Sequence, residues 1–222
     1  MSARELILGR IRDAVADVPR AEPPAWEPDA EQDDATMYAR SGSLDSRSLV
    51  ELLAERCADY RATVTRCENG DSSIAVAVRN AFTRHSVDAL VTPPDLPPGW
   101  VPAEVPARVD APPLPLAELD SGVAVLTGCA LAIALTGTIA LDAGPAQGRR
   151  ALTLVPDVHI CVVRAAQIVF GVPEAVDALG RAVREARRPL TLISGPSATS
   201  DIELVRVEGV HGPRRLEIIL AG

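Results

Sequence analysis

The sequence contains no lysine, because all 22 of its basic residues are arginines. This absence excludes a P-loop lysine, a Schiff-base lysine and the lysine that anchors pyridoxal phosphate. No Gly-x-Gly-x-x-Gly pattern occurs either, which disfavours a Rossmann-type dinucleotide site. We therefore expect no cofactor that depends on these groups.

Cysteine and histidine are also scarce. The four cysteines are Cys57, Cys67, Cys129 and Cys161, and no Cys-x-x-Cys pair is present. This spacing encodes no local iron–sulfur cluster or tetrahedral zinc site. The three histidines lack metal-binding spacing, so we expect no metal. Free thiols in a reducing cytoplasm are the default interpretation.

The net charge of −8 disfavours nucleic acid as a partner, because phosphate binding requires a basic surface. Five of the eight net negative charges lie within residues 19–36. The uncharged run 121–141 is long enough for a membrane span, but its glycines and threonines favour buried strands separated by a turn. The charged N-terminal segment is not a signal peptide. We therefore expect a cytoplasmic protein without a membrane segment.

Three segments are predicted along the chain. Residues 1–18 form an amphipathic helix whose apolar stripe includes Ile7, Ile11 and Val15. Residues 19–42 form an acidic, proline-rich linker, and residues 43–222 form the folded domain. The helix must bury its stripe either on its own domain or on a partner, and both alternatives remain open.

Strands alternate with helices in residues 43–222. This order predicts an α/β fold with a layered, largely parallel sheet flanked by helices. In such sheets, functional groups lie on loops beyond the carboxyl ends of the strands. We therefore expect the functional residues in polar loops that follow apolar segments.

The first candidate loop, residues 195–203, follows an apolar strand and reads as the start of a helix. Its glycine allows close backbone approach, and its hydroxyl groups and amides suit an anion. A simple N-cap cluster is the alternative. The residues concerned are Gly195, Ser197, Thr199 and Asp201.

Two further segments carry candidate residues. Thr136, Gly137 and Thr138 lie between apolar strands and either line a pocket or simply suit a strand. In the turn 209–215, His211 could act as an acid or base, and Arg214 could hold a carboxylate through two parallel hydrogen bonds. The alternative is a tight turn with solvated arginines.

His159 lies within a predicted strand. It either packs in the core or contributes to a pocket.

The segment 192–220 resembles the C-terminal signature of LUD-domain proteins, and more narrowly that of the lactate utilization protein C branch. The segments 134–141, 152–169 and 7–15 match the same family. The resemblance implies a fold like that of the NagB/RpiA/CoA-transferase group. It also implies a role in oxidising L-lactate to pyruvate beside two iron–sulfur partner proteins, which fits a chain without a cysteine cluster.

Each candidate segment corresponds to a motif of this family. Thr136–Thr138 match its Thr-Gly-Thr turn, and His159 matches its Pro-x-x-His strand. The loop beginning at Gly195 and the turn beginning at His211 match its Gly-Pro-Ser and His-Gly-Pro-Arg motifs. Many relatives carry glutamate before Thr-Gly-Thr, whereas this chain has Leu135, which can be neither nucleophile nor base.

Our hypothesis is a non-redox subunit or accessory protein of lactate oxidation, in which three segments converge on a small-carboxylate pocket. His211 and Arg214 would be catalytic, and the other candidate residues would bind the substrate. One alternative is a stand-alone enzyme with CoA-transferase-like or isomerase-like chemistry. Another is a structural adaptor that docks through the N-terminal helix. A homo-oligomer is left open.

Overall fold

The computed structural model describes residues 3–14, 16, 44–184, 186–200 and 206–222. The chain divides into two compact units, residues 1–38 and 39–222. The first unit contains α1 (Ala3–Ala14), a helix on which Leu6, Ile7 and Leu8 are exposed. The predicted linker over 19–42 and the end of the predicted N-terminal helix at 17–18 lie outside the described residues.

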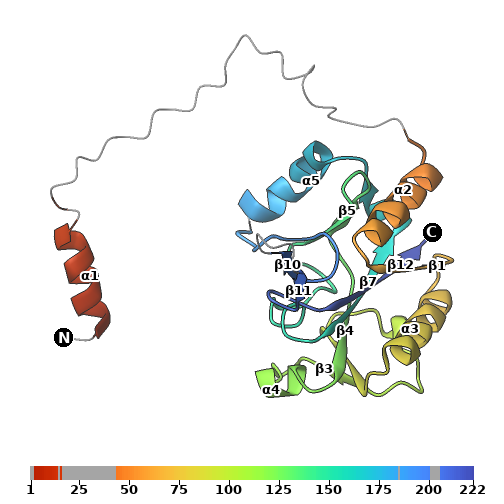
Figure 1. Ribbon diagram of the computed structural model, residues 1–222, viewed down its shortest axis with the longest axis horizontal. Coiled ribbons are helices and arrows are strands. Elements are labelled where there is room, and N and C mark those ends of the chain that lie inside the picture. Colours follow the sequence, from red (N-terminus) through yellow and green to blue (C-terminus); the bar gives the residue numbers. More distant parts are fainter. Residues whose placement is uncertain (1–2, 15, 17–43, 185, 201–205) are drawn as a thin grey trace, which may run out of the picture. The chain divides into compact units, whose positions relative to one another are not determined.

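The second unit is built on a six-stranded sheet in which every neighbouring pair of strands is parallel (Figure 1). This arrangement confirms the predicted α/β fold with a layered, largely parallel sheet. The strands, in spatial order, are β1 (Thr63–Cys67), β12 (Arg215–Ala221), β7 (Val158–Arg164), β4 (Val123–Thr127), β2 (Ala89–Thr92) and β3 (Ala107–Val109).

The central strands are almost continuously apolar because both faces of this sheet are covered. On one face, α3 (Asp71–His85) buries Ile74 and Val78 against β4 and β7. On the other face, α2 (Ser46–Asp59) buries Leu53. The carboxylate of Asp45 caps α2 by accepting a hydrogen bond of 2.7 Å from the Ser48 backbone N–H.

A second sheet lies on the same side of the main sheet as α2. Its own opposite face packs against α5 (Val172–Arg184), so the layers run from α3 through the two sheets to α5. The strands, in spatial order, are β8 (Ile168–Val169), β5 (Leu131–Ile133), β6 (Thr138–Leu141) and β9 (Thr191–Ile193).

The uncharged run 121–141 therefore forms β4, β5 and β6 rather than one long helix. Within the described ranges, no helix is long and apolar enough to cross a membrane. The remaining short elements are η1 (Pro98–Trp100), α4 (Leu116–Leu119), η2 (Ala165–Gln167), β10 (Ala198–Ser200) and β11 (Arg206–Glu208).

The loop after Gly195 does not form the predicted start of a helix. Instead of starting a helix, its residues 198–200 form β10, which pairs with β11 in antiparallel register. Backbone hydrogen bonds favour the extended form, because Ser197 N–H donates to Pro213 O at 2.8 Å and Gly209 N–H donates to Ser197 O at 2.9 Å. No helix N-terminus is therefore formed at residues 198–200 to bind an anion.

Candidate functional site

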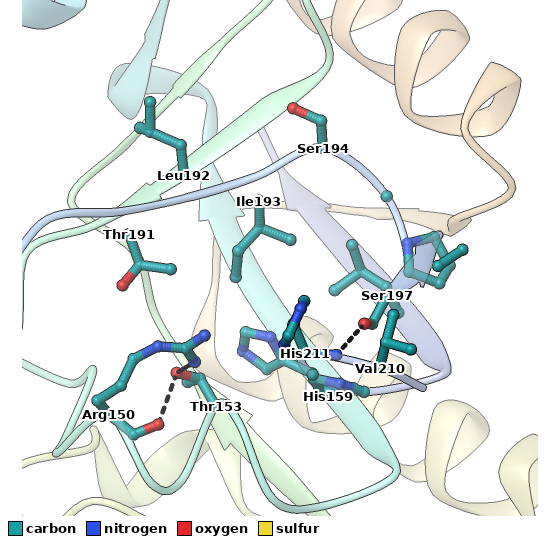
Figure 2. Close-up of a pocket in the computed structure, with 16 residues that line it drawn as sticks. Arg150, Thr153, His159, Thr191, Leu192, Ile193, Ser194, Ser197, Val210 and His211 are labelled. Atoms are coloured by element: carbon teal, nitrogen blue, oxygen red, sulfur yellow. Dashed lines mark hydrogen bonds between the residues drawn. The ribbon is translucent and has the colours of Figure 1, made fainter. Parts of the chain in front are cut away.

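A cavity of about 230 Å³ lies at the amino ends of β7 and β12 (Figure 2). We call it the arginine–histidine cavity. Figure 2 shows Arg150 and Thr153 at one side and Ser197 and His211 at the other, with the strand β9 running across. The loops that precede β7 and β12, together with the loop that follows β9 of the second sheet, supply these groups. The prediction had instead relied on carboxyl-end loops of the main sheet.

Arg150 is the cation of this cavity. Its guanidinium donates a hydrogen bond of 3.0 Å to the Thr153 hydroxyl, and no carboxylate among the described residues pairs with it. Partial burial lowers the pKa of Arg150 from its ordinary value. The side chain nevertheless stays charged at neutral pH, so most of its N–H donors are available to an anion.

His159 forms part of the wall and is fully buried. Its Nε2 lies 2.8 Å from the Thr127 hydroxyl, whereas the buried Nδ1 makes no hydrogen bond with any described residue. Buried polar atoms are nearly always paired, so such an atom in a cavity wall points to a functional role. When Nε2 donates to Thr127, Nδ1 is an acceptor.

The predicted loop at 195–198 and the turn at 209–213 meet at this cavity. The Ser197 hydroxyl accepts a hydrogen bond of 2.9 Å from the backbone N–H of His211. His211 itself is exposed. Gly195 has a φ of +84°, and a Cβ there would lie 2.7 Å from both Cβ and O of Tyr60. Only glycine fits this close passage past the end of α2.

The Thr-Gly-Thr turn lies behind the cavity and is not part of its lining. It joins β5 and β6, which are antiparallel, and the Thr136 and Thr138 hydroxyls lie 2.8 Å apart. Thr138 Oγ1 is also 2.8 Å from the hydroxyl of Ser194, which does line the cavity. Gly137, at a φ of +61°, passes close to the backbone of Arg56. The turn therefore contacts the segment after β9 through Ser194 and lies outside the cavity lining.

Arg214, which was predicted to lie in the same pocket, is not part of the arginine–histidine cavity lining. Its Nε pairs with the Asp157 carboxylate, which also accepts a hydrogen bond of 2.9 Å from Arg215. Burial would raise the pKa of Asp157, but the bonds from Arg214 and Arg215 outweigh it and lower the pKa. Arg214 and Asp157 line a neighbouring hollow of about 420 Å³ instead.

Two predicted residues cannot be placed in this site. Thr199 lies on β10, but its side chain is not among those described, and Asp201 lies outside the described residues. Leu135 is 47% exposed and is not part of the cavity lining. A glutamate at position 135 in relatives would therefore stand outside the cavity wall.

The sequence analysis missed Arg150, Thr153 and Ser194. The only sequence signal for Arg150 is the Arg149–Arg150 pair shortly before an apolar strand. Such a pair does not reveal which arginine is already held by a carboxylate. In the described part of the chain, no group of three or more histidine, cysteine or acidic side chains is arranged to hold a metal.

Comparisons with known proteins agree with this architecture. Residues 119–221, from before β4 to the end of β12, match the LUD domain family. A crystal structure of a DUF162 family protein from Deinococcus radiodurans superposes with a TM-score of 0.70 at 42% identity, covering 81% of this chain and 99% of that one. The fold and its C-terminal part, residues 119–221, are thus those of a LUD-domain protein, and the chain belongs to this family.

Named relatives show which branch of the family the chain resembles. The chain is 49% identical over 187 residues to Lactate utilization protein C of Deinococcus radiodurans, which covers 83% of this chain and 85% of that protein. It is 40% identical over 91 residues to Lactate utilization protein C of Bacillus pumilus, covering 40% of this chain and 38% of that one. The resemblance to the lactate utilization protein C branch is confirmed.

Proposed function

We propose that this chain acts in lactate utilization as a component that binds a small carboxylate and carries no electrons itself. The observation that carries the proposal is the arginine–histidine cavity, in which Arg150, unpaired with any carboxylate of the described residues, faces the same space as His159 and His211. The names of the relatives from Deinococcus radiodurans and Bacillus pumilus supply the biological setting.

The size and polarity of the cavity suit a ligand such as L-lactate or pyruvate. At about 230 Å³ it is smaller than the roughly 300–1,000 Å³ typical of sites for drug-sized molecules. Arg150 would bind the carboxylate through its N–H donors. The hydroxyls of Thr153 and Ser197 would orient the adjacent hydroxyl or carbonyl oxygen, and the exposed His211 would move a proton there.

Oxidation of L-lactate to pyruvate releases two electrons and two protons, and the electrons need a carrier. The sequence has no Cys-x-x-Cys motif of the kind that binds an iron–sulfur cluster. We therefore assign electron transfer to iron–sulfur partner proteins and proton transfer or ligand binding to this chain. The division into a helix (1–18), a linker (19–42) and a LUD domain (43–222) belongs to the same proposal, with the helix as a candidate contact to such partners.

Binding of pyruvate to the purified chain tests this proposal. Replacing Arg150 with glutamine should weaken the affinity measured by calorimetry about 10- to 100-fold, because a hydrogen bond to a charged group contributes about 1.5–3 kcal/mol. Circular dichroism would verify that the variant is folded.

Arg214→Gln is the matched control, because Arg214 lies in the neighbouring hollow and pairs with Asp157. It should change the affinity by less than about twofold, or about 0.4 kcal/mol. Equal weakening by both substitutions, or binding that Arg150→Gln leaves unchanged, would rule out the proposed role of Arg150.

The alternative of a stand-alone enzyme needs a nucleophile in the site. Many relatives have a glutamate at position 135, but this chain has a leucine there. Leu135 lies outside the arginine–histidine cavity lining, and the acidic Asp157 is occupied by two arginines. Turnover of lactate or of an acyl-CoA by the purified single chain would favour this alternative over a non-redox component.

A further inference from the structure

A cluster of buried thiols lies on the face of the main sheet that is turned toward α2. Cys161 on β7 is in register with Thr127 of β4, and Cys129 follows β4 by two residues. Both belong to one hydrophobic cluster with Cys57 of α2. The Cys161 thiol donates to the Gly128 carbonyl at 3.6 Å, which places it beside the residue adjoining Cys129. The proposed function uses none of these thiols.

Only one member of the Cys129–Cys161 pair borders open space. Cys129 lines a cavity of about 740 Å³ against α5, whereas Cys161 is fully buried. We call this space the α5 cavity. Its volume is within the range of about 300–1,000 Å³ that accommodates organic ligands. Leu179 and Ala182 of α5 supply apolar lining opposite the thiol.

The α5 cavity also contains a cationic group. Arg188 lines it and pairs with the Asp142 carboxylate at 2.9 Å through one terminal nitrogen. The Nε of Arg188 is buried and makes no hydrogen bond with any described residue. The Arg188 side chain is 35% exposed, so the donors on its exposed part can meet a negatively charged group on a ligand.

The two thiols differ in acidity. The neighbouring Cys161 and burial both raise the pKa of Cys129. The Cys129 thiol, and then His159 and Thr127, lower the pKa of Cys161 in opposition to burial. Cys129 is therefore the weaker acid of the two. His159 projects from β7 two residues before Cys161, and its Nδ1 has no hydrogen-bond partner among the described residues.

We propose that Cys129 and Cys161 form a thiol–disulfide exchange site that admits a small anionic organic disulfide through the α5 cavity. The Cys129 sulfur attacks one sulfur of the organic disulfide, and its proton passes to water in the α5 cavity. The organic S–S bond breaks, one thiolate leaves, and a mixed disulfide remains on Cys129.

Cys161 completes the reaction. Its sulfur attacks the Cys129 sulfur, its proton passes to Nδ1 of His159, and the second thiolate leaves. The protein dithiol is thereby oxidised by two electrons to a Cys129–Cys161 disulfide, and the organic disulfide is reduced to two thiols.

Dithiobis-nitrobenzoate, an anionic aromatic disulfide, is the probe for this reaction. The full chain should release two thiolate equivalents from this pair without retaining the aromatic group, and peptide mapping should recover a Cys129–Cys161 link. Cys161→Ser should stop at the mixed disulfide on Cys129. Cys129→Ser should slow the first release at least about tenfold, because Cys161 is not exposed.

Cys67→Ser is the matched control, since Cys67 lies half-buried on β1 and belongs to neither the pair nor the α5 cavity. It should leave the reaction of the pair unchanged. Thermal melting would verify that each variant is folded. Mapping that recovers a Cys57–Cys161 link, a retained aromatic group in the unsubstituted chain, or equal rates for the unsubstituted chain and Cys129→Ser would overturn the proposal.

Arg188→Gln tests the charge preference. It should slow the reaction with dithiobis-nitrobenzoate several-fold and leave the reaction with neutral hydroxyethyl disulfide unchanged. Arg187→Gln, an exposed neighbour outside the cavity lining, should affect neither probe. Equal slowing with both probes would overturn the preference for an anionic disulfide.

Discussion

Three arginines near the arginine–histidine cavity differ in what already occupies their guanidinium groups. Arg149 holds the buried Asp110 through bonds of 2.7 and 3.0 Å, and Arg214 holds Asp157. Arg150, next to Arg149 in the chain, bonds through its guanidinium to the Thr153 hydroxyl and to no carboxylate in the described part of the chain. A carboxylate partner occupies N–H donors of an arginine, so Arg150 has more donors left for a substrate anion than Arg149 or Arg214.

The backbone at Gly195 offers a residue-scale test of the cavity wall. Gly195→Ala should lower the free energy of unfolding by about 1–3 kcal/mol, because a Cβ would strain the positive φ and meet Tyr60. It should also weaken pyruvate binding, since the loop carrying Ser197 must move. Denaturant unfolding and calorimetry measure the two effects.

Gly70→Ala provides the comparison. Gly70 has an extended backbone with a φ of −150°, and a Cβ there would meet no atom within 4 Å. We expect a loss below about 1 kcal/mol. A Gly195→Ala protein as stable as the unsubstituted chain would show that the loop does not need its left-handed backbone.

At the scale of elements, periodicity predicted the individual strands and helices well but not their partners. The apolar segment at 191–193 is a strand as expected, yet it pairs antiparallel with β6 in the second sheet. The segment at 198–200 pairs with β11 instead of starting a helix. Local sequence does not specify these partners, because they come from segments 6 to 54 residues away in the chain.

Glu217 joins three elements. This fully buried carboxylate on β12 accepts hydrogen bonds from Thr65 of β1 at 2.6 Å and from Arg84 of α3 at 2.5 Å, and His85 lies 3.0 Å away. Burial would raise the pKa of Glu217, but the bonds from His85, Arg84 and Thr65 lower it below its ordinary value of 4.5. The carboxylate therefore stabilises the attachment of α3 to the sheet.

Glu217→Gln should lower the free energy of unfolding by about 3–5 kcal/mol at neutral pH, because it breaks a buried charge pair. When the pKa of a carboxylate is lower in the native than in the unfolded protein, the carboxylate stabilises the native protein above the unfolded pKa. This stabilisation is lost as the pH falls through the native pKa. The unsubstituted chain should therefore lose stability below about pH 4.5, whereas the variant should lack this component.

Denaturant unfolding across that pH range measures the effect. Glu118→Gln is the control, because Glu118 pairs with Arg108 at the surface and such pairs contribute about 0–1 kcal/mol. Identical pH profiles for the unsubstituted chain and Glu217→Gln would contradict the assigned role of this carboxylate.

At the scale of the whole molecule, the hydrophobic clusters found among the described residues lie within residues 39–222. A chain of residues 39–222 should therefore unfold in one cooperative transition, with a midpoint within about 2 °C of that of the full chain by calorimetry. A broad or absent transition would show that the N-terminal unit is needed for folding.

Removal of residues 1–38 also tests whether the N-terminal helix binds partner proteins. Because α1 exposes Leu6, Ile7 and Leu8, we expect removal of residues 1–38 to abolish copurification of iron–sulfur partners from the native host. Arg150→Gln should leave copurification intact. Retention of the partners by the truncated chain would exclude the helix as the docking element.

The sequence by itself determined the class of fold and the kinship, because alternating apolar segments and the motifs of residues 192–220 are local patterns. It also identified His159, Gly195, Ser197 and His211, which lie in or against one cavity. Only the tertiary structure decided that Arg150 rather than Arg214 faces this cavity. The reason is that Asp157 and Asp110 select their arginine partners through space, and adjacent identical residues cannot be distinguished until those carboxylates are placed.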